Sequence, residues 1–230
     1  MRLHVGTSGF SYPAWKGTFY PSDISAKDML RFYSDAFGTV EINNTFYRMP
    51  QPAMLEGWTQ QVHDDFQFVL KAPQRITHHQ KLVDVADSVA RFFEVRKALG
   101  TKAGPSLFQL PPFMKKDAAK LEAFFALVPE GERIVMEFGN PSWFDDEIFE
   151  LLEEKSAALC IVDDEKKNVP FRRTAPFGYL RLRRVVYSKD DLVSWRKRIE
   201  EAGWEDAYVF FKHEDEGTGP RFAREFIAAI

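Results

Sequence analysis

Eight short apolar runs alternate with helical patterns along this chain of 230 residues, and that alternation limits the fold more than any other feature. The runs are rich in Val, Ile, Phe and Tyr and are bounded by polar residues, glycine or proline, which is typical of buried strands. They lie at residues 3–6, 39–42, 66–71, 106–110, 134–138, 158–162, 177–182 and 207–211. Strands that alternate with helices in this way predict parallel βαβ units.

Most gaps between the runs carry apolar residues at a helical spacing. Helix starts are indicated by a possible capping box from Ser25 to Asp28, by Asp145, and by a second capping box from Ser188 to Asp191. The sixth gap, residues 163–176, holds two prolines and no helical period. We therefore expect the sixth helix to be short or irregular.

Such units can form either an open doubly wound sheet or a closed eight-stranded barrel. An open sheet usually carries a glycine-rich phosphate loop after its first strand. Here that turn reads Gly6-Thr7-Ser8-Gly9, which matches neither the GxGxxG pattern nor the P-loop. The count of eight units favours an α/β fold of the TIM (β/α)8 barrel type, formed as a single domain by residues 1–230.

Composition excludes several classes of protein. The net charge is −3, so any site for a polyanion must be local. The single Cys160 excludes an intramolecular disulfide framework. No apolar run approaches the length of a membrane span, and Met1 leads at once into the first apolar run without room for a signal peptide. We expect a cytoplasmic protein without membrane association, and the sequence does not predict an oligomeric state.

The apolar runs become polar at their C-terminal ends, where TIM barrels carry their function. Alternate residues of a barrel strand face inward. The polar residues at inward-facing positions of the strand ends should therefore lie together at one opening of the barrel, here called the mouth. These residues are Ser8, Glu41, Asn43, Lys71, Gln109, Glu137, Asp163 or Asp164, Arg181 and Lys212. Charges are costly to bury singly, so they should either neutralise one another or bind a ligand.

Several longer stretches resemble the domain of unknown function 72 family, the YecE-like TIM barrels. Two of them are distinctive: GTSGFSYPAWKGTFYP at residues 6–21 and VEINNTFYRMP at residues 40–50. Further matches at residues 66–71, 76–78, 107–113, 136–144, 179–182 and 208–213 cover the chain from end to end. The resemblance implies a single TIM barrel but no established function, because the proposed link to nucleic acid rests on an analogy of fold with barrel endonucleases.

The chain departs from the family pattern at two strand ends. Gly139 and Asn140 follow Glu137-Phe where the family often has Arg-His, and Arg183-Arg184 stands where His-Gly is common. The first departure removes a cation and an imidazole from the mouth. Any catalysis that needs these two groups is therefore put in doubt.

The ligand that such a mouth suits best is an anion. Lys71, Arg181 and Lys212 would hold a phosphorylated or nucleic-acid-derived ligand, and Glu41 or Glu137 would act as general acid or base. A non-catalytic barrel that only senses or binds such a ligand is the alternative, so the sequence leaves open whether the protein is an enzyme.

Other groups could contribute to the ligand site or exclude particular chemistry. Trp15 in the first loop and Tyr47 in the second could stack on a base or sugar, although the first loop could equally be a hydrophobic lid. The five histidines form no HExxH motif, so we expect neither a metal nor a cofactor.

Overall fold

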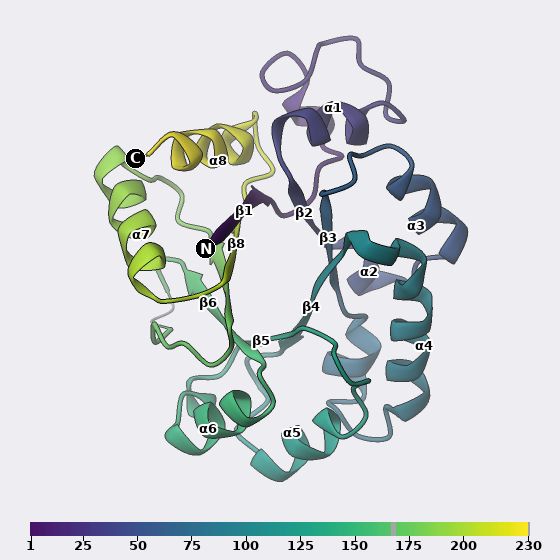
Figure 1. Ribbon diagram of the computed structural model, residues 1–230, viewed down its shortest axis with the longest axis vertical. Coiled ribbons are helices and arrows are strands. Elements are labelled where there is room, and N and C mark those ends of the chain that lie inside the picture. Colours follow the sequence, from purple (N-terminus) through teal and green to yellow (C-terminus); the bar gives the residue numbers. More distant parts are fainter. Residues whose placement is uncertain (167–168, 230) are drawn as a thin grey trace.

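Eight parallel strands form one sheet in the computed structural model, which describes residues 1–166 and 169–229. Their order is β1-β8-β7-β6-β5-β4-β3-β2, so consecutive strands are neighbours and the sheet curls until β1 lies beside β2 (Figure 1). This is the nearly closed TIM-like barrel that the alternation predicted. The strands are β1 (Arg2–Thr7), β2 (Thr39–Ile42), β3 (Gln67–Lys71), β4 (Ala103–Leu110), β5 (Ile134–Phe138), β6 (Ala158–Asp163), β7 (Phe177–Leu182) and β8 (Asp206–Phe211).

The helices surround this ring of strands (Figure 1). They are α1 (Met29–Ala36), α2 (Asn44–Tyr47), α3 (Pro52–Thr59), α4 (Ala86–Arg96), α5 (Ala118–Phe125), α6 (Asp146–Glu154), α7 (Lys189–Glu201) and α8 (Thr218–Ala228). Between β6 and β7, residues 164–166 and 169–176 contain no helix, so the irregular sixth connection is confirmed. Within the described residues, no helix has both the length and the apolar composition that a membrane span requires.

Two of the three predicted helix starts are confirmed. The Asp145 side chain accepts a hydrogen bond from the backbone of Glu147, and Ser188 and Asp191 form a reciprocal capping box on α7. The capping box at Ser25 is wrong. Asp28 is the N-cap of α1 without a side-chain cap, and its carboxylate instead accepts a hydrogen bond from the Ser25 hydroxyl.

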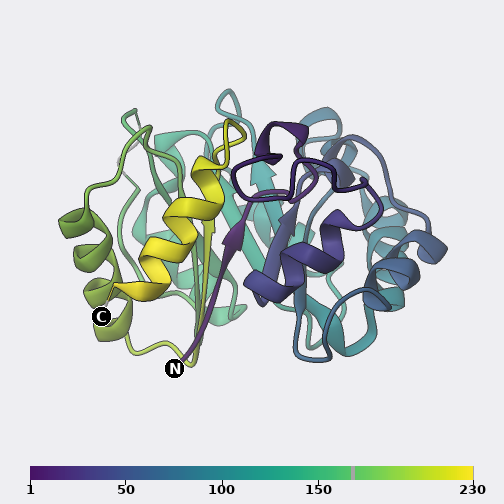
Figure 2. The same cartoon turned by 90° about the horizontal axis from the view of Figure 1, so that it is seen from above.

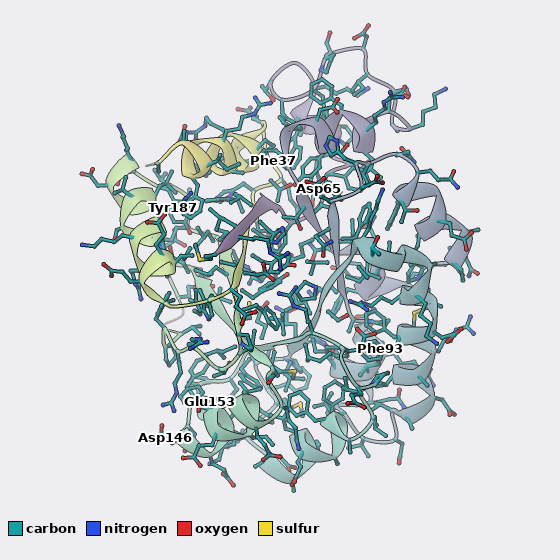
Figure 3. All side chains as sticks on the ribbon, in the orientation of Figure 1. Phe37, Asp65, Phe93, Asp146, Glu153 and Tyr187 are labelled. Carbon is teal, nitrogen blue, oxygen red and sulfur yellow. The ribbon has the colours of Figure 1, made fainter. Side chains whose placement is uncertain are left out.

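Apolar side chains form two layers on either side of the sheet. One cluster lies inside the ring, where Val69, Leu107, Val135, Tyr179 and Phe210 meet, and a larger cluster lies between the strands and the helices. Figure 3 shows side chains filling the space that the ribbon encloses. The barrel is thus a packed core, and ligands can reach only its two ends.

The seam between β1 and β2 is closed by an isolated bridge, whereas the other neighbouring strands pair along a ladder. It is bridged by the pairing of Ser8 with Glu41, and the Gly9 amide donates to the Glu41 carbonyl at 2.7 Å. Lower in the seam, the buried Tyr33 hydroxyl accepts from the Thr7 amide at 2.8 Å and donates to the Thr39 carbonyl at 3.0 Å. One side-chain hydroxyl therefore links the two strands where their backbones do not pair.

Candidate functional site

The mouth at the C-terminal ends of the strands is centred on one buried arginine. Arg181 at the end of β7 donates to Glu41 of β2 through Nη2 and to Glu137 of β5 through Nη1, both at 2.6 Å. All three side chains are buried. Burial alone would lower the pKa of Arg181, but the two carboxylates outweigh it and raise that pKa above its ordinary value. The two predicted catalytic glutamates are therefore joined through a permanent cation.

Both carboxylate oxygens of Glu41 accept further hydrogen bonds. The Ser8 hydroxyl donates to Oε1 and the Tyr179 hydroxyl donates to Oε2, each at 2.6 Å. Burial, followed by the charge of Glu41, raises the pKa of Tyr179 well above its ordinary value, so this hydroxyl keeps its proton and remains a donor. Glu41 thus has donors on both oxygens and no exposed surface.

Glu137 is held in the same way, by a residue of β4 and by a second arginine that follows β7. The Gln109 amide of β4 donates to Oε1 at 2.6 Å, which matches the pairing of the two residues in the sheet register. Arg183, just beyond β7, places Nη2 3.1 Å from both carboxylate oxygens. Arg183 and Tyr179 belong to this cluster but were not predicted as site residues, although both lie at the same alternating positions as Arg181.

Lys71 is a buried cation of the mouth that no carboxylate of the described residues neutralises directly. In the described part of the chain no ion pair or hydrogen bond engages its ammonium, which lies 4.0 Å from the centre of the Phe46 ring. Its exposed fraction is 8%. Burial, with the nearby charge of Arg181 and Lys212, lowers the pKa of Lys71 to about 8. Part of the Lys71 population is therefore a neutral amine near physiological pH.

A π-helical turn at Arg75–His79 follows β3 and adds an imidazole beside Lys71. The His78 ring packs edge-on against Phe46 with a centroid distance of 4.9 Å, so lysine and histidine share one aromatic neighbour. Burial and the charge of Lys71 lower the pKa of His78. His78 is thus biased towards the neutral form that can accept a proton.

Asp163 does not join the mouth, which corrects the expectation from the strand ends. On β6, Cys160 and Val162 face the ring interior, so Asp163 has the opposite parity and faces outward. Its Oδ2 accepts from Arg184 Nε and from Trp195 Nε1, both at 2.9 Å. Because neighbouring residues of a strand point to opposite faces, the inward position of Val162 predicts an outward position for Asp163.

Trp15 is buried within the first loop and offers no face to a ligand. Its exposed fraction is 0%, and its ring is enclosed by Tyr12, Phe19 and Tyr20 at centroid distances of 4.7, 5.8 and 6.0 Å. Figure 2 shows the first loop near the C-terminal end of β1, and in Figure 1 it lies beside α1, outside the ring of strands. Trp15 packs against other aromatic side chains of this loop and is not free to stack on a ligand.

The other candidate residues surround the mouth at different depths. Lys212, after β8, is exposed, and Asn43 is partly buried beside Gly9 and Phe10 at a small hollow of about 80 Å³. Tyr47 is 73% exposed and lines a separate hollow of about 390 Å³ with Phe46. The structure thus brings Ser8, Lys71, Gln109, Arg181 and the two glutamates together, and it leaves Trp15 and Tyr47 outside this group.

A second polar region lies at the opposite end of the strands. There a hollow of about 760 Å³ is lined by residues that include Arg2, His4, Arg133 and Asp206. Asp206 pairs with Arg2 at 2.7 Å and with Arg133 at 3.1 Å, so its charges are largely matched internally. In barrels of this type the N-terminal end usually serves stability, and we place the functional site at the other end.

Neither end offers a clear metal site. Across residues 1–166 and 169–229, no three His, Cys, Asp or Glu side chains gather as ligands would. At the family departure, a Cβ on Gly139 would lie 2.6 Å from the Pro112 backbone nitrogen, so this backbone has no room for a longer residue. The cation absent from position 139 is supplied to Glu137 by Arg183 instead.

A parallel eight-stranded barrel whose C-terminal mouth holds a buried carboxylate–arginine network defines the class of this protein as TIM-like. The model of the family described as "Protein of unknown function DUF72" matches residues 4–230. The chain belongs to the DUF72 family, as its sequence motifs predicted.

Relatives and solved structures agree with this assignment. The UPF0759 protein YecE of Escherichia coli is 29% identical over 62% of this chain, and the match spans only 50% of YecE. The UPF0759 protein YunF of Bacillus subtilis is 24% identical over 99% of this chain and 94% of its own. A DUF72 family protein from Thermotoga maritima superposes with a TM-score of 0.89 at 25% identity, covering 99% of this chain and 98% of its own.

Proposed function

We propose that the barrel mouth binds an anionic ligand, of the phosphorylated or nucleic-acid-derived class. The observation that carries this proposal is the local charge balance. Four cationic side chains (Lys71, Arg181, Arg183 and Lys212) act in the mouth against two carboxylates, in a chain whose net charge is −3. A local excess of positive charge within an acidic chain favours an anion at that place.

The cations divide into two groups with different roles. Arg181 is buried between Glu41 and Glu137, so it holds the carboxylates and is not free to meet a ligand. Lys71, Arg183 and the exposed Lys212 keep surface at the mouth and are the residues that would contact the anion.

The buried state of the glutamates favours binding over acid–base catalysis by these residues. A general base must reach the proton that it removes, within hydrogen-bond distance or through one water. Both Glu41 and Glu137 have 0% exposure, and donors from the protein already occupy their oxygens. We assign them to positioning the cations of the mouth.

Thermal unfolding with added ligand tests the proposal. Inorganic phosphate, a nucleoside monophosphate or a short oligonucleotide should raise the melting temperature, because a ligand that binds only the folded state stabilises it. Lys212→Ala should reduce the rise, whereas the control Lys197→Ala, whose side chain is 74% exposed on α7, should leave it unchanged. If the rise in melting temperature with the oligonucleotide falls steeply as salt is added, the ligand is a nucleic acid. If none of the three anions shifts the melt, the mouth is structural and the proposal fails.

A further inference from the structure

The position of Lys71 is unusual for a lysine that serves only to balance charge. Its side chain ends inside the mouth, over the Phe46 ring, and only 8% of the residue is exposed. Lysine is rarely buried without a partner because desolvation of the ammonium is costly. The fold therefore tolerates an unfavourable group at this place.

The nearby glutamates do not offset that cost directly. Glu41 already accepts from Ser8, Tyr179 and Arg181, and Glu137 accepts from Arg181, Arg183 and Gln109. Among the described residues no carboxylate forms an ion pair with Lys71. The charges of Glu137 and Glu41 favour its ammonium form, but burial and the charge of Arg181 outweigh them and lower its pKa. The surroundings thus keep the amine of Lys71 available.

We infer that Lys71 is a covalent site whose amine forms an imine with the aldehyde or ketone group of a phosphorylated ligand held at the mouth. This inference rests on the proposed function, because the cations Arg183 and Lys212 would hold the phosphate while the amine meets the carbonyl. A lysine that is desolvated or placed near another cation is activated as a nucleophile, and Lys71 is buried over the Phe46 ring near the charge of Arg181.

The chemistry balances without a cofactor. The neutral amine of Lys71 attacks the carbonyl carbon and gives a carbinolamine, and the new C–N bond becomes a C=N bond as the former carbonyl oxygen leaves. That oxygen departs as water with the two protons that the amine loses. His78, which shares the Phe46 ring with Lys71, is the nearby imidazole suited to carry one of these protons.

Reductive trapping tests the inference. The full chain is incubated with glyceraldehyde 3-phosphate and sodium cyanoborohydride, which reduces an imine to a stable secondary amine, and the modified residue is mapped by peptide mass spectrometry. We expect one adduct, at Lys71, formed at least tenfold faster than with unphosphorylated glyceraldehyde and slowed by inorganic phosphate. The rate should rise between about pH 7 and pH 9 as the amine loses its proton.

Two variants separate this inference from anion binding itself. Lys71→Arg keeps the charge but not the nucleophile, so it should lose the adduct and keep the rise in melting temperature with phosphate. Lys97→Arg, at a side chain that is 72% exposed, should behave as the wild type. A phosphate-dependent melt without an adduct at Lys71, or equal labelling of other lysines, overturns the inference and leaves the proposed function standing. If neither the adduct at Lys71 nor the rise in melting temperature with phosphate is seen, the inference and the proposed function both fail. If Lys71→Arg does not fold, the mapping of the adduct on the wild type decides the inference alone.

Discussion

Arg183 Nη2 lies 3.1 Å from both carboxylate oxygens of Glu137 and so brings a second guanidinium to a glutamate that Arg181 already neutralises. The side chain of Arg183 is 16% exposed, whereas that of Arg181 is 1% exposed. Arg183 is therefore the arginine of this cluster that stands between the buried network and the solvent at the mouth.

Replacement of Arg183 should weaken anion binding. In Arg183→Ala, Glu137 keeps Arg181 and Gln109, so the fold should persist while the mouth loses one cation. The rise in melting temperature with inorganic phosphate should fall by at least half. The neighbouring Arg184→Ala is the matched control, because Arg184 pairs with the outward-facing Asp163 and should keep the full rise. Equal losses in both variants would contradict the assignment.

Replacement of Arg181 should destabilise the protein strongly. Arg181→Met leaves two buried carboxylates without their shared cation, and breaking a buried ion pair from one side costs about 3–5 kcal/mol. Arg221→Met, in a surface pair with Glu225, should change the free energy of unfolding by less than about 1 kcal/mol. Urea unfolding measures both. Adding Glu41→Gln and Glu137→Gln to Arg181→Met should recover part of the lost free energy of unfolding. No recovery would show that the loss comes from packing and not from the buried charges.

The free energy of unfolding should depend on pH through Lys71. Its pKa is about 8 in the folded protein, below the ordinary value of 10.5. Between these values the unfolded chain binds a proton that the folded chain has released, so this group makes stability rise with pH across that window.

Lys71→Met should remove that dependence. The variant should also be more stable than the wild type at pH 7 by about 3 kcal/mol, since the folded pKa of about 8 lies about 2.5 units below 10.5 and one unit corresponds to about 1.4 kcal/mol. Urea unfolding of both proteins from pH 7 to 10 gives the difference, in which the tyrosines common to both cancel. Parallel curves would mean that Lys71 is solvated as in the unfolded chain.

The Tyr33 hydroxyl should matter for closure of the ring. Tyr33→Phe leaves the Thr7 amide and the Thr39 carbonyl without their shared partner in a buried seam, which should cost about 1–3 kcal/mol. Hydrogen exchange should speed up first at β1 and β2. Tyr47→Phe, at a side chain with 73% exposure, is the control and should be neutral in both measurements.

Patterns along the chain were sufficient for the architecture and for much of the mouth. Apolar runs and helical periods are local properties. Alternation along each strand predicted the inner positions at the barrel end for five residues: Glu41, Lys71, Gln109, Glu137 and Arg181. The same parity, applied within β6, would have turned Asp163 outward. These features are readable because a strand alternates its side chains whatever lies around it.

Only the tertiary structure decided how the charges of the mouth combine. Arg181 and Glu41 are separated by 140 positions in the chain, and no local pattern indicates that this arginine joins two glutamates while Lys71 is left with an aromatic ring. The burial of Trp15 and the link through Tyr33 likewise depend on how the first loop and α1 pack against the strands. Pairing and exposure are set by distances between segments remote in sequence, which periodicity does not contain.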